Sequence, residues 1–175
     1  MEEFKEYLDV VNENDEVVGR DTRKNIHAEN KTHREVHVFI INPTDRKILV
    51  QKRSKNIINY PGCYDASVGA HVLSGESYEQ AAKREVEEEV GIKPKGMKHV
   101  LDYKSYLGKQ QVNRRLFVCY SAGPFEIDKR DVELVRFFSP EDIKKEIETG
   151  KMNFTQGFKL SFRHYLKFMD QNPKP

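Results

Sequence analysis

The stretch from Ala70 to Ile92 reads AHVLSGESYEQAAKREVEEEVGI, and its second half has the pattern of a capped helix. Ser77 is a favourable N-cap, and Gln80 three residues later completes a capping box. Gly91 and then Pro94 end the helix. Small and apolar side chains share one broad face of it, namely Ala81, Ala82, Val86 and Val90. We therefore predict an amphipathic helix that packs this face on a core.

The same helix carries four carboxylates within residues 85–89. Glu85, Glu88 and Glu89 lie three and four positions apart and so share a face, whereas Glu87 points elsewhere. Like charges at this spacing destabilise an isolated helix by roughly 0.2–0.5 kcal/mol per pair. A hard divalent cation such as Mg²⁺ binds carboxylate and phosphate oxygens and would offset this repulsion. Taken alone, a charge run is more often a solvated face.

Nine positions of the stretch have a fixed spacing that extends beyond the glutamates. They are Ala70, Glu76, Arg84, Glu85, Val86, Glu88, Glu89, Gly91 and Ile92. Eight of the nine match the pattern known as the Nudix box, and Ala70 stands where that pattern has glycine. The chain therefore resembles the Nudix hydrolase superfamily, over about residues 32–169. The methyl group of Ala70 concerns the loop geometry more than the carboxylates.

The resemblance implies the Nudix fold, of the α/β (α+β) class, in which a mixed β-sheet is sandwiched between helices. It implies a hydrolase that cuts a diphosphate linkage by attack of water on phosphorus, in a small nucleoside-like or isoprenoid-like substrate. The implied cofactor is Mg²⁺ or Mn²⁺, because such ions neutralise phosphate charge and activate water. The implied metal ligands are Glu85, Glu88, Glu89 and the carbonyl of Gly69.

The resemblance also assigns roles beside the metal. One of the ligating glutamates is expected to act as general base, so Glu88 and Glu89 are candidate catalytic residues. Arg84 is expected to orient the glutamates by salt bridges, and Glu76 to support the site from the preceding loop. One more acidic ligand is expected from outside the box, with Glu126, Asp128, Asp131 and Glu133 as candidates. We favour Asp131, although a solvated surface position suits each of the four equally well.

Segments around the helix resemble one branch of the superfamily. His33–Ile40, Ile48–Ser54 and Tyr60–Val72 look like the branch related to type I isopentenyl-diphosphate isomerase. That isomerase shifts an allylic proton with a cysteine just before a Gly-His pair and a glutamate on a later strand. Here Gly69 occupies the cysteine position and Gln111–Arg115 contains no carboxylate. Hydrolysis is therefore the main hypothesis, and an isomerase-like enzyme is its rival. A Nudix module that binds a nucleotide without cutting it is the third hypothesis.

Basic and histidine side chains are candidates for contact with the substrate, because a diphosphate favours charge-assisted partners. The candidate basic residues are Lys52, Arg53, Lys55, Arg114 and Arg115. We favour Lys52, Arg53 and Arg115, together with His71, although ordinary surface positions explain each cation equally well. His33, His37 and His71 are remnants of an isomerase-type metal site, substrate contacts or, most commonly for a lone histidine, hydrogen-bonded structural groups.

The remainder of the chain is predicted to be structured. Residues 1–31 are expected to pack on a main domain of residues 32–170, followed by a frayed tail at 171–175. The N-terminal part is expected to begin with a hairpin, and the polar stretch 20–32 has no predicted element. Strands are predicted at 36–41, 48–51, 64–72, 97–106, 115–121 and 132–138, and a helix at 139–149. A last helix carries the apolar stripe Phe158, Phe162, Tyr165, Leu166 and Met169. We expect Asn56–Cys63 and Asp102–Asn113 to be loops that set specificity.

Charge and composition narrow the class of partner. The 30 basic and 28 acidic residues leave a formal net charge of +2, so no global field favours nucleic acid or a membrane. The sequence has neither a membrane span nor a signal peptide pattern, which predicts a cytoplasmic protein. Cys63 and Cys119 form no C-x-x-C pair, so we expect both to be reduced and buried. The expected partner is a small diphosphate, and a homodimer is expected by base rate alone.

Overall fold

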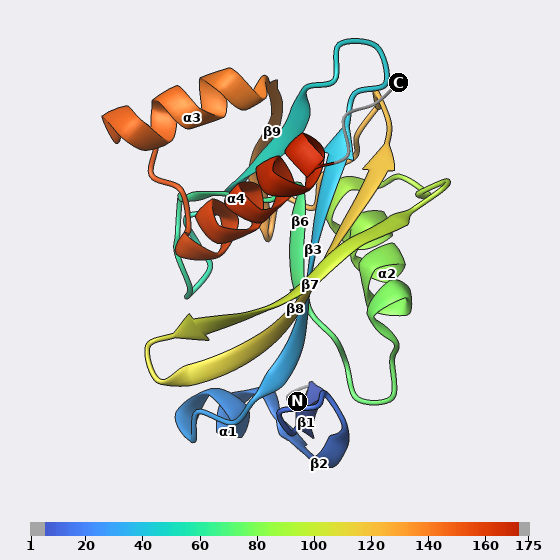
Figure 1. Ribbon diagram of the computed structural model, residues 1–175, viewed down its shortest axis with the longest axis vertical. Helices are drawn as coiled ribbons and strands as arrows, with labels where there is room; N and C mark the ends of the chain where they lie inside the picture. Colours follow the sequence, from blue (N-terminus) through green and yellow to red (C-terminus); the bar gives the residue numbers. More distant parts are fainter. Residues whose placement is uncertain (1–5, 172–175) are drawn as a thin grey trace.

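The structure, a computed structural model, describes residues 6–171 and contains a mixed β-sheet between helices (Figure 1). The described residues form a seven-stranded sheet of order β5-β4-β3-β8-β7, in which β6 also pairs with β3 and β9 with β4. Its strands are β3 (His33–Ile41), β4 (Ile48–Arg53), β5 (Tyr64–Asp65), β6 (Val68–His71), β7 (Lys98–Leu107), β8 (Gln110–Tyr120) and β9 (Val132–Phe138). β3 and β8 run parallel, and the other pairs are antiparallel. The predicted fold class is confirmed.

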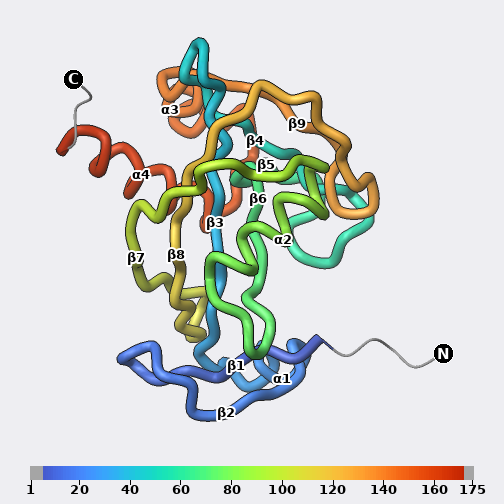
Figure 2. The backbone as a smooth tube through the Cα atoms, turned by 90° about the vertical axis from the view of Figure 1, so that its right-hand side faces the viewer, coloured from blue at the N-terminus to red at the C-terminus, as the bar shows by residue number. Residues whose placement is uncertain are grey.

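Strand β3 lies between two apolar cores, because alternate side chains of a strand point to opposite faces. One core joins α2 (Tyr78–Val90) to the β3 residues Val36, Val38 and Ile40. The other joins α4 (Gln156–Gln171) and α3 (Pro140–Thr149) to Phe39 and Ile41. Figure 2 shows α2 and α4 on either side of β3. The predicted stripe on the last helix packs as expected, with Phe158, Phe162 and Tyr165 buried.

The N-terminal part forms β1 (Tyr7–Val11), β2 (Val17–Thr22) and the short helix α1 (Arg23–Ala28). β1 and β2 make the predicted antiparallel hairpin. The helix occupies the segment without assignment, and with six residues it is too short to show a helical period. Leu8 and Ile26 are fully buried, and Leu8 bridges to Leu73. This part therefore packs on the main sheet, while a domain boundary after residue 31 stays a prediction.

Helix α2 has the predicted ends. The Ser77 hydroxyl accepts a hydrogen bond from the backbone N–H of Gln80, and the Gln80 side chain accepts one from the backbone N–H of Ser77. Gly91 ends the helix with a φ of 71°. Ala70 lies in β6 opposite Val36 and is not among the described non-glycine residues with positive φ. The strand thus accommodates alanine at the one position that departs from the box.

Two predictions about the strands are wrong. Residues 102–113 are not a loop, because β8 begins at Gln110 and forms a hairpin with β7 through a tight turn at Gly108, φ 62°. The segment 64–72 is two strands, since β5 pairs with β4 whereas β6 pairs with β3.

Further predictions concern the cysteines and the ends of the chain. Cys63 and Cys119 are buried and free, as predicted. Within residues 6–171 no helix is long and apolar enough to cross a membrane. Residues 1–5 and the tail beyond Gln171 lie outside the described residues.

Candidate active site

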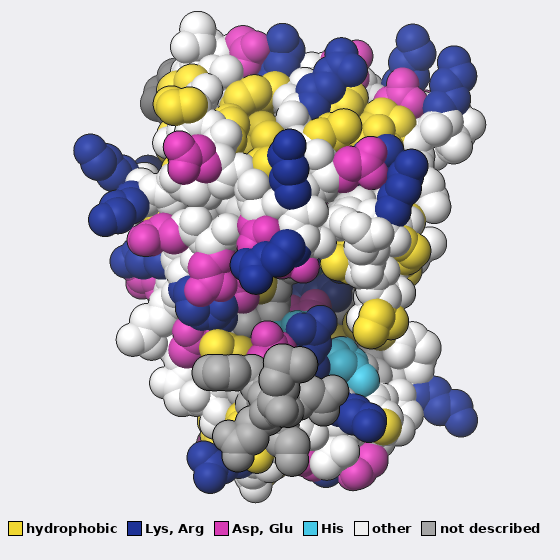
Figure 3. Space-filling model, turned by 180° about the vertical axis from the view of Figure 1, so that it is seen from behind, with side chains coloured by type: hydrophobic (Ala, Val, Ile, Leu, Met, Phe, Trp, Pro, Cys, Tyr) yellow, Lys and Arg dark blue, Asp and Glu magenta, His cyan; other side chains and the backbone are white. Residues whose placement is uncertain are grey.

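Helix α2 presents the glutamates of the box to a cavity because its apolar side is committed to the core. This cavity of about 240 Å³, which we call the carboxylate cavity, lies on the face of the molecule shown in Figure 3, where acidic, basic and histidine side chains surround a hollow. Its lining includes Glu85, Glu88, Glu89, Arg84, Gly69, Asp131, Gln51, Arg53, His71 and Arg23. The structure thus brings together all the side chains and the glycine that we predicted as metal ligands.

The end of α2 explains how Asp131 reaches this cavity. A Cβ atom at Gly91 would lie 2.7 Å from atoms of Glu126, so the segment between β8 and β9 passes directly over the helix end. The backbone N–H of Glu126 donates to the carbonyl of Val90, and that of Asp128 to the carbonyl of Glu89. The helix terminus therefore holds the acidic segment in place. Of the four acidic candidates outside the box, Asp131 lines the carboxylate cavity.

Arg84 ties the loop before the helix to the glutamates. Its Nε and Nη2 donate to the two carboxylate oxygens of Glu76 at 2.7 and 2.9 Å. Its Nη1 donates to Glu85 at 2.5 Å and lies 3.4 Å from a Glu88 oxygen. Burial acts to raise the pKa of Glu76, but the hydrogen bonds from Arg84 and from the backbone N–H of Leu73, together with the charge of Arg84, lower it. This arrangement fits the predicted orienting role of Arg84.

The surroundings of Glu85 and Glu89 disfavour their charged forms. Glu89 accepts a hydrogen bond from Nε2 of Gln51 at 3.2 Å, a neutral partner. Burial, and next the charge of Glu85, raise the pKa of Glu89 well above its ordinary value. The pKa of Glu85 is also raised by burial, although Arg84 opposes the shift. The carboxylate cavity therefore favours the arrival of positive charge.

A second cavity of about 130 Å³ adjoins the first, and we call it the adjoining cavity. Both cavities are lined by Arg23, Arg53, Gly69, Ala70 and His71. The adjoining cavity extends to Glu35, His37 and Arg114 of the sheet and to Thr155 and Gly157 at the start of α4. Nε of Arg114 donates to one carboxylate oxygen of Glu35 at 2.7 Å, and Nη2 of Arg114 lies 2.6 Å from the same oxygen.

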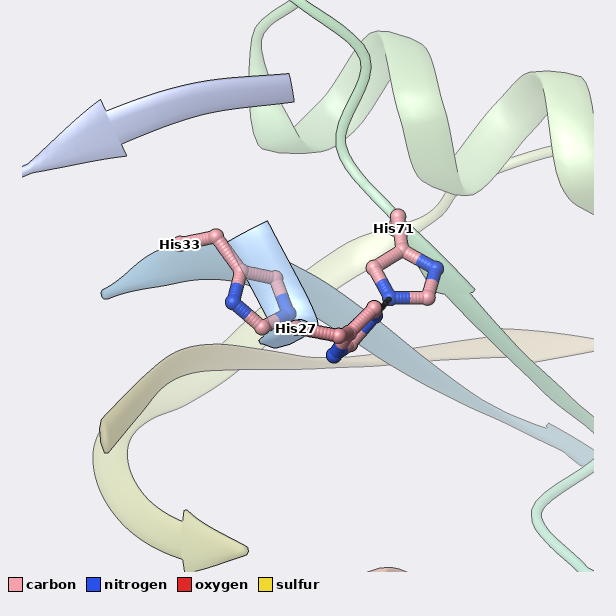
Figure 4. A group of neighbouring side chains, drawn as sticks. All are labelled: His27, His33 and His71. Carbon is pink, nitrogen blue, oxygen red and sulfur yellow. Dashed lines mark hydrogen bonds between the residues drawn. The ribbon is translucent and has the colours of Figure 1, made fainter. Parts of the chain in front are cut away.

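Figure 4 shows three neighbouring histidines, His27, His33 and His71. Nε2 of His33 and Nε2 of His71 lie 3.3 and 3.6 Å from a carboxylate oxygen of Glu35. The Nε2 atoms of His27 and His71 are 3.0 Å apart, and the rings of His33 and His71 stack with centroids 5.2 Å apart. Burial lowers the pKa of His71 to about 3 and also lowers that of His27. One ligand atom from each ring lies within 4.8 Å of the others, a spacing that fits a metal ion with nitrogen ligands. His37 lies outside this group.

Two of the predicted substrate contacts lie elsewhere. Lys52 pairs with Glu133 at 2.8 Å, and Arg115 donates twice to Asp102 at 2.7 Å and lies over the ring of Tyr78. Neither Lys52 nor Arg115 lines the two cavities, whereas Arg53 and His71 line both. For Arg115 the reason is strand alternation, which puts its side chain on the face of the sheet opposite that of Arg114.

Sequence reasoning missed several residues at the site. Arg23 and His27 come from α1, the segment left without assignment, and Glu35 was not singled out as a partner of Arg114. No local pattern marks these residues, because they meet only through tertiary packing. A buried position for Glu35 does follow from its place in the apolar run of β3, and that was the available signal.

Comparisons with known proteins agree with this geometry. Residues 31–158 match the family described as NUDIX domain. An uncharacterized Nudix hydrolase of Yersinia pestis is 34% identical over 140 residues, which cover 79% of this chain and 75% of the relative. The uncharacterized Nudix hydrolase YfcD of Escherichia coli (strain K12) is 34% identical over 140 residues, or 79% and 76% of the two chains.

Solved structures give the same picture of the fold. The crystal structure of DR0079 from Deinococcus radiodurans superposes with a TM-score of 0.79 at 26% identity and covers 91% of this chain and 99% of that one. A MutT protein from Methanosarcina mazei Go1 has a TM-score of 0.66 at 22% identity and covers 82% and 96%. The second likeness concerns the fold alone.

Proposed function

Because this chain belongs to the Nudix hydrolase family, whose enzymes cleave pyrophosphate bonds, we propose that it uses Mg²⁺ or Mn²⁺ to hydrolyse a small organic diphosphate. The carboxylate cavity is the observation that carries this proposal. Glu85, Glu88, Glu89 and Asp131 all line it, with the backbone of Gly69 at its edge. Four acids in one cavity suit a hard divalent cation, which takes oxygen ligands.

The donor set passes a simple test of fit to such an ion. Burial holds the pKa values of Glu85 and Glu89 above their ordinary values, so the chain alone does not balance these charges. Arg84 is shared between Glu76 and Glu85, and no hydrogen bond from it to Glu89 is found among the described residues. When bound, a divalent ion supplies positive charge that stabilises the carboxylates, neutralises the diphosphate and favours water as a nucleophile.

The chain's own residues supply position and proton transfer. Arg84 and Glu76 hold the glutamates in place, and Arg53 at the junction of the two cavities is placed to contact phosphate oxygens. Water attacks one phosphorus atom, its proton passes to Glu88 or Glu89, and the bridging P–O bond breaks. The products are two phosphate compounds, with the electron pair of the broken bond on the leaving oxygen.

The isomerase-like rival has one favourable observation, the group of His27, His33 and His71. Two observations support ranking it second. Gly69 stands at the position where the resemblance implies a cysteine, and Gln111–Arg115 of β8, where it implies a glutamate, contains no carboxylate. An allylic proton shift needs an acid and a base on opposite faces of the substrate.

A metal-dependent substrate screen tests the proposal. Phosphate release is measured over a panel of diphosphates with Mg²⁺, with Mn²⁺ and with a chelator, and interconversion of isopentenyl and dimethylallyl diphosphate is followed in parallel. We expect metal-dependent release that Glu88→Gln reduces strongly and Glu87→Gln, on the exposed side of the same helix, leaves unchanged. Isomerisation without phosphate release would favour the rival, and tight nucleotide binding without product would favour a binding module.

A further inference from the structure

The hairpin of β1 and β2 precedes residue 31, where the match to the Nudix family begins, yet it contacts the loop that leads into α2. This loop, residues 73–77, joins β6 to α2, and we call it the approach loop. Figures 1 and 2 show that the chain before α2 runs down to β1 and β2. Leu8 of β1 forms an antiparallel bridge with Leu73. The hairpin therefore extends its backbone pairing onto the approach loop.

Asp9 of β1 holds the middle of the approach loop. One carboxylate oxygen of Asp9 accepts a hydrogen bond from the hydroxyl of Ser74 at 2.6 Å, and the other accepts from the backbone N–H of Gly75 at 3.2 Å. The backbone N–H of Ser74 also donates to the carbonyl of Tyr7 at 2.8 Å. Asp9 is buried, and hydrogen bonds to a charged group are stronger than those between neutral groups. These contacts therefore fix the turn at Gly75.

Asp15, in the turn between β1 and β2, holds the far side of the same loop. Its Oδ1 accepts from the hydroxyl of Tyr78 at 3.1 Å, and Tyr78 is the first residue of α2. The same oxygen accepts from Nε of Arg34 at 3.0 Å and from Nδ2 of Asn113 at 2.9 Å, which fix Asp15 against the main sheet. The hairpin thus holds the chain on both sides of Glu76.

Glu76 connects the approach loop to the metal-binding face of α2. The backbone N–H of Leu73 donates to its carboxylate at 3.0 Å, which ties the side chain to its own loop. Both oxygens of Glu76 accept from Arg84, and Arg84 also contacts Glu85 and Glu88. A continuous series of contacts therefore runs from the hairpin to two of the glutamates that line the carboxylate cavity.

We propose that the N-terminal hairpin positions the metal-binding glutamates, with Asp9 as its main positioning residue. Asp9 does not line the carboxylate cavity, so it acts only through the approach loop, Glu76 and Arg84. Ligands that are held in place beforehand lose less conformational freedom when an ion binds, and they bind it more tightly. This inference rests on the proposed hydrolase function, because it concerns the affinity of the same cavity for a divalent ion.

Binding of Mn²⁺ alone tests the inference without catalysis. The full chain is titrated with Mn²⁺ and the free ion is measured by EPR, and only the binding that Glu88→Gln removes is assigned to the carboxylate cavity. We expect Asp9→Ala to raise the Kd of that site at least about three-fold, less than the roughly 10–100-fold cost of losing a group that contacts the ligands directly. An unchanged Kd overturns the proposal.

Asp9→Asn is the conservative variant. Its carbonyl oxygen can accept from the backbone N–H of Gly75, and its amide can donate to the hydroxyl of Ser74. We expect Asp9→Asn to keep most of the Mn²⁺ affinity that Asp9→Ala loses. A loss as large as that of Asp9→Ala would show that these two contacts do not carry the effect.

Val11→Ala is the matched structural control on the same strand. Val11 is buried, and its backbone N–H donates to the carbonyl of Thr32 and not to the approach loop. The lost packing should lower the melting temperature, while the Kd for Mn²⁺ stays unchanged. If Val11→Ala and Asp9→Ala weaken Mn²⁺ binding equally, the hairpin acts through general stability and the proposal fails.

A double-mutant cycle tests the route through Glu76. Glu76→Gln breaks the paired contact with Arg84, so the hairpin can no longer act on the glutamates by this route. Asp9→Ala should therefore weaken Mn²⁺ binding much less in the Glu76→Gln background than in the natural chain. Effects that simply multiply would overturn the route.

The inference and the proposed function fail by different results. With a diphosphate that the substrate screen identifies, Asp9→Ala should raise the Mg²⁺ concentration for half-maximal rate and leave KM for the diphosphate unchanged at saturating Mg²⁺. If no diphosphate is turned over, the proposed hydrolase function fails, and the Mn²⁺ titrations still decide the role of Asp9. If the natural chain binds no Mn²⁺ that Glu88→Gln removes, the inference is overturned.

Discussion

Two glutamates of this protein, partly buried Glu89 on α2 and buried Glu35 on β3, differ in how the surrounding chain balances their charge. Glu35 lies against Arg114, and although burial acts to raise its pKa, the charge of Arg114 and the neighbouring His33 and His71 together hold the pKa well below the ordinary value. Glu89 has neutral Gln51 as its hydrogen-bond donor and acidic Glu85 nearby, and its pKa is raised. The chain itself supplies a cation to Glu35, whereas the hydrogen-bond donor to Glu89 is neutral.

The difference separates a glutamate that holds the structure, Glu35, from one that we propose takes part in the chemistry, Glu89. The paired glutamate fixes Arg114 at the end of the adjoining cavity, where a guanidinium held on one side presents its other side. The unpaired glutamate retains an unfavourable charge, a common property of functional positions. Breaking the first arrangement should therefore cost stability, and breaking the second should cost activity.

The largest effect is expected from Arg114→Met, which leaves Glu35 buried without its counter-charge. The free energy of unfolding should fall by about 3–5 kcal/mol in urea titrations. Arg115→Met on the same strand is the matched control, because Arg115 pairs with the half-exposed Asp102 and should cost about 1 kcal/mol or less. Equal losses in the two variants would contradict the contrast, and Glu35→Gln added to Arg114→Met should restore part of the stability.

Glu89→Gln tests the other glutamate. We expect kcat to fall at least about 100-fold, more than for loss of a residue that merely supports a metal site. The free energy of unfolding should stay the same or rise, since a partly buried carboxylate with only a neutral hydrogen-bond donor is replaced by an amide. Activity and urea unfolding are measured on the same preparation, with Glu87→Gln as control. A large loss of stability would mean that Glu89 is a structural residue.

Arg84→Lys should have a smaller effect on the same region. Lysine keeps the charge but cannot make the two parallel bonds to Glu76, so the glutamates lose orientation. We expect kcat to fall about ten-fold with an unchanged melting temperature. Lys83→Arg, at an exposed pair with Glu79, is the control. An unchanged kcat for Arg84→Lys would show that any cation suffices there.

The smallest effect concerns pH and Glu35. Its pKa is lowered in the folded state, so its contribution to stability is fully present above about pH 4.5, the ordinary value, and is lost as the pH falls below it. Urea titrations at pH 6 and pH 4 should show a steeper loss for the natural chain than for Glu35→Gln. Parallel losses in the two proteins would remove Glu35 from the acid-sensitive groups.

The two glutamates also show which features can be predicted from the sequence and which cannot. Helix α2 was predicted with its caps because capping, helical period and charge spacing all act within a few residues. The pairing of Glu35 with Arg114 spans 79 positions and depends on the parallel register of β3 and β8. Nothing local encodes that register, and the late start predicted for β8 hid its first five residues.

The same limit explains why Arg115, a predicted substrate contact, does not line either cavity. Arg114 and Arg115 are equivalent in sequence, and which one faces the cavity is set by strand alternation once β8 pairs with β3. Helix α1 shows the converse case, since its six residues are too few for a periodic signal yet bring His27 and Arg23 to the site.

The parallel pairing of β3 with β8 has a consequence for how the chain reaches this state. The partners His33 and Val112 come from distant parts of the sequence, so the middle of the sheet closes a long loop, a topology that slows folding. On a ribosome, β3 and the helix with its glutamates emerge well before β8. The nascent chain therefore carries an open β3 edge, prone to wrong pairing, until residue 120 has left the exit tunnel.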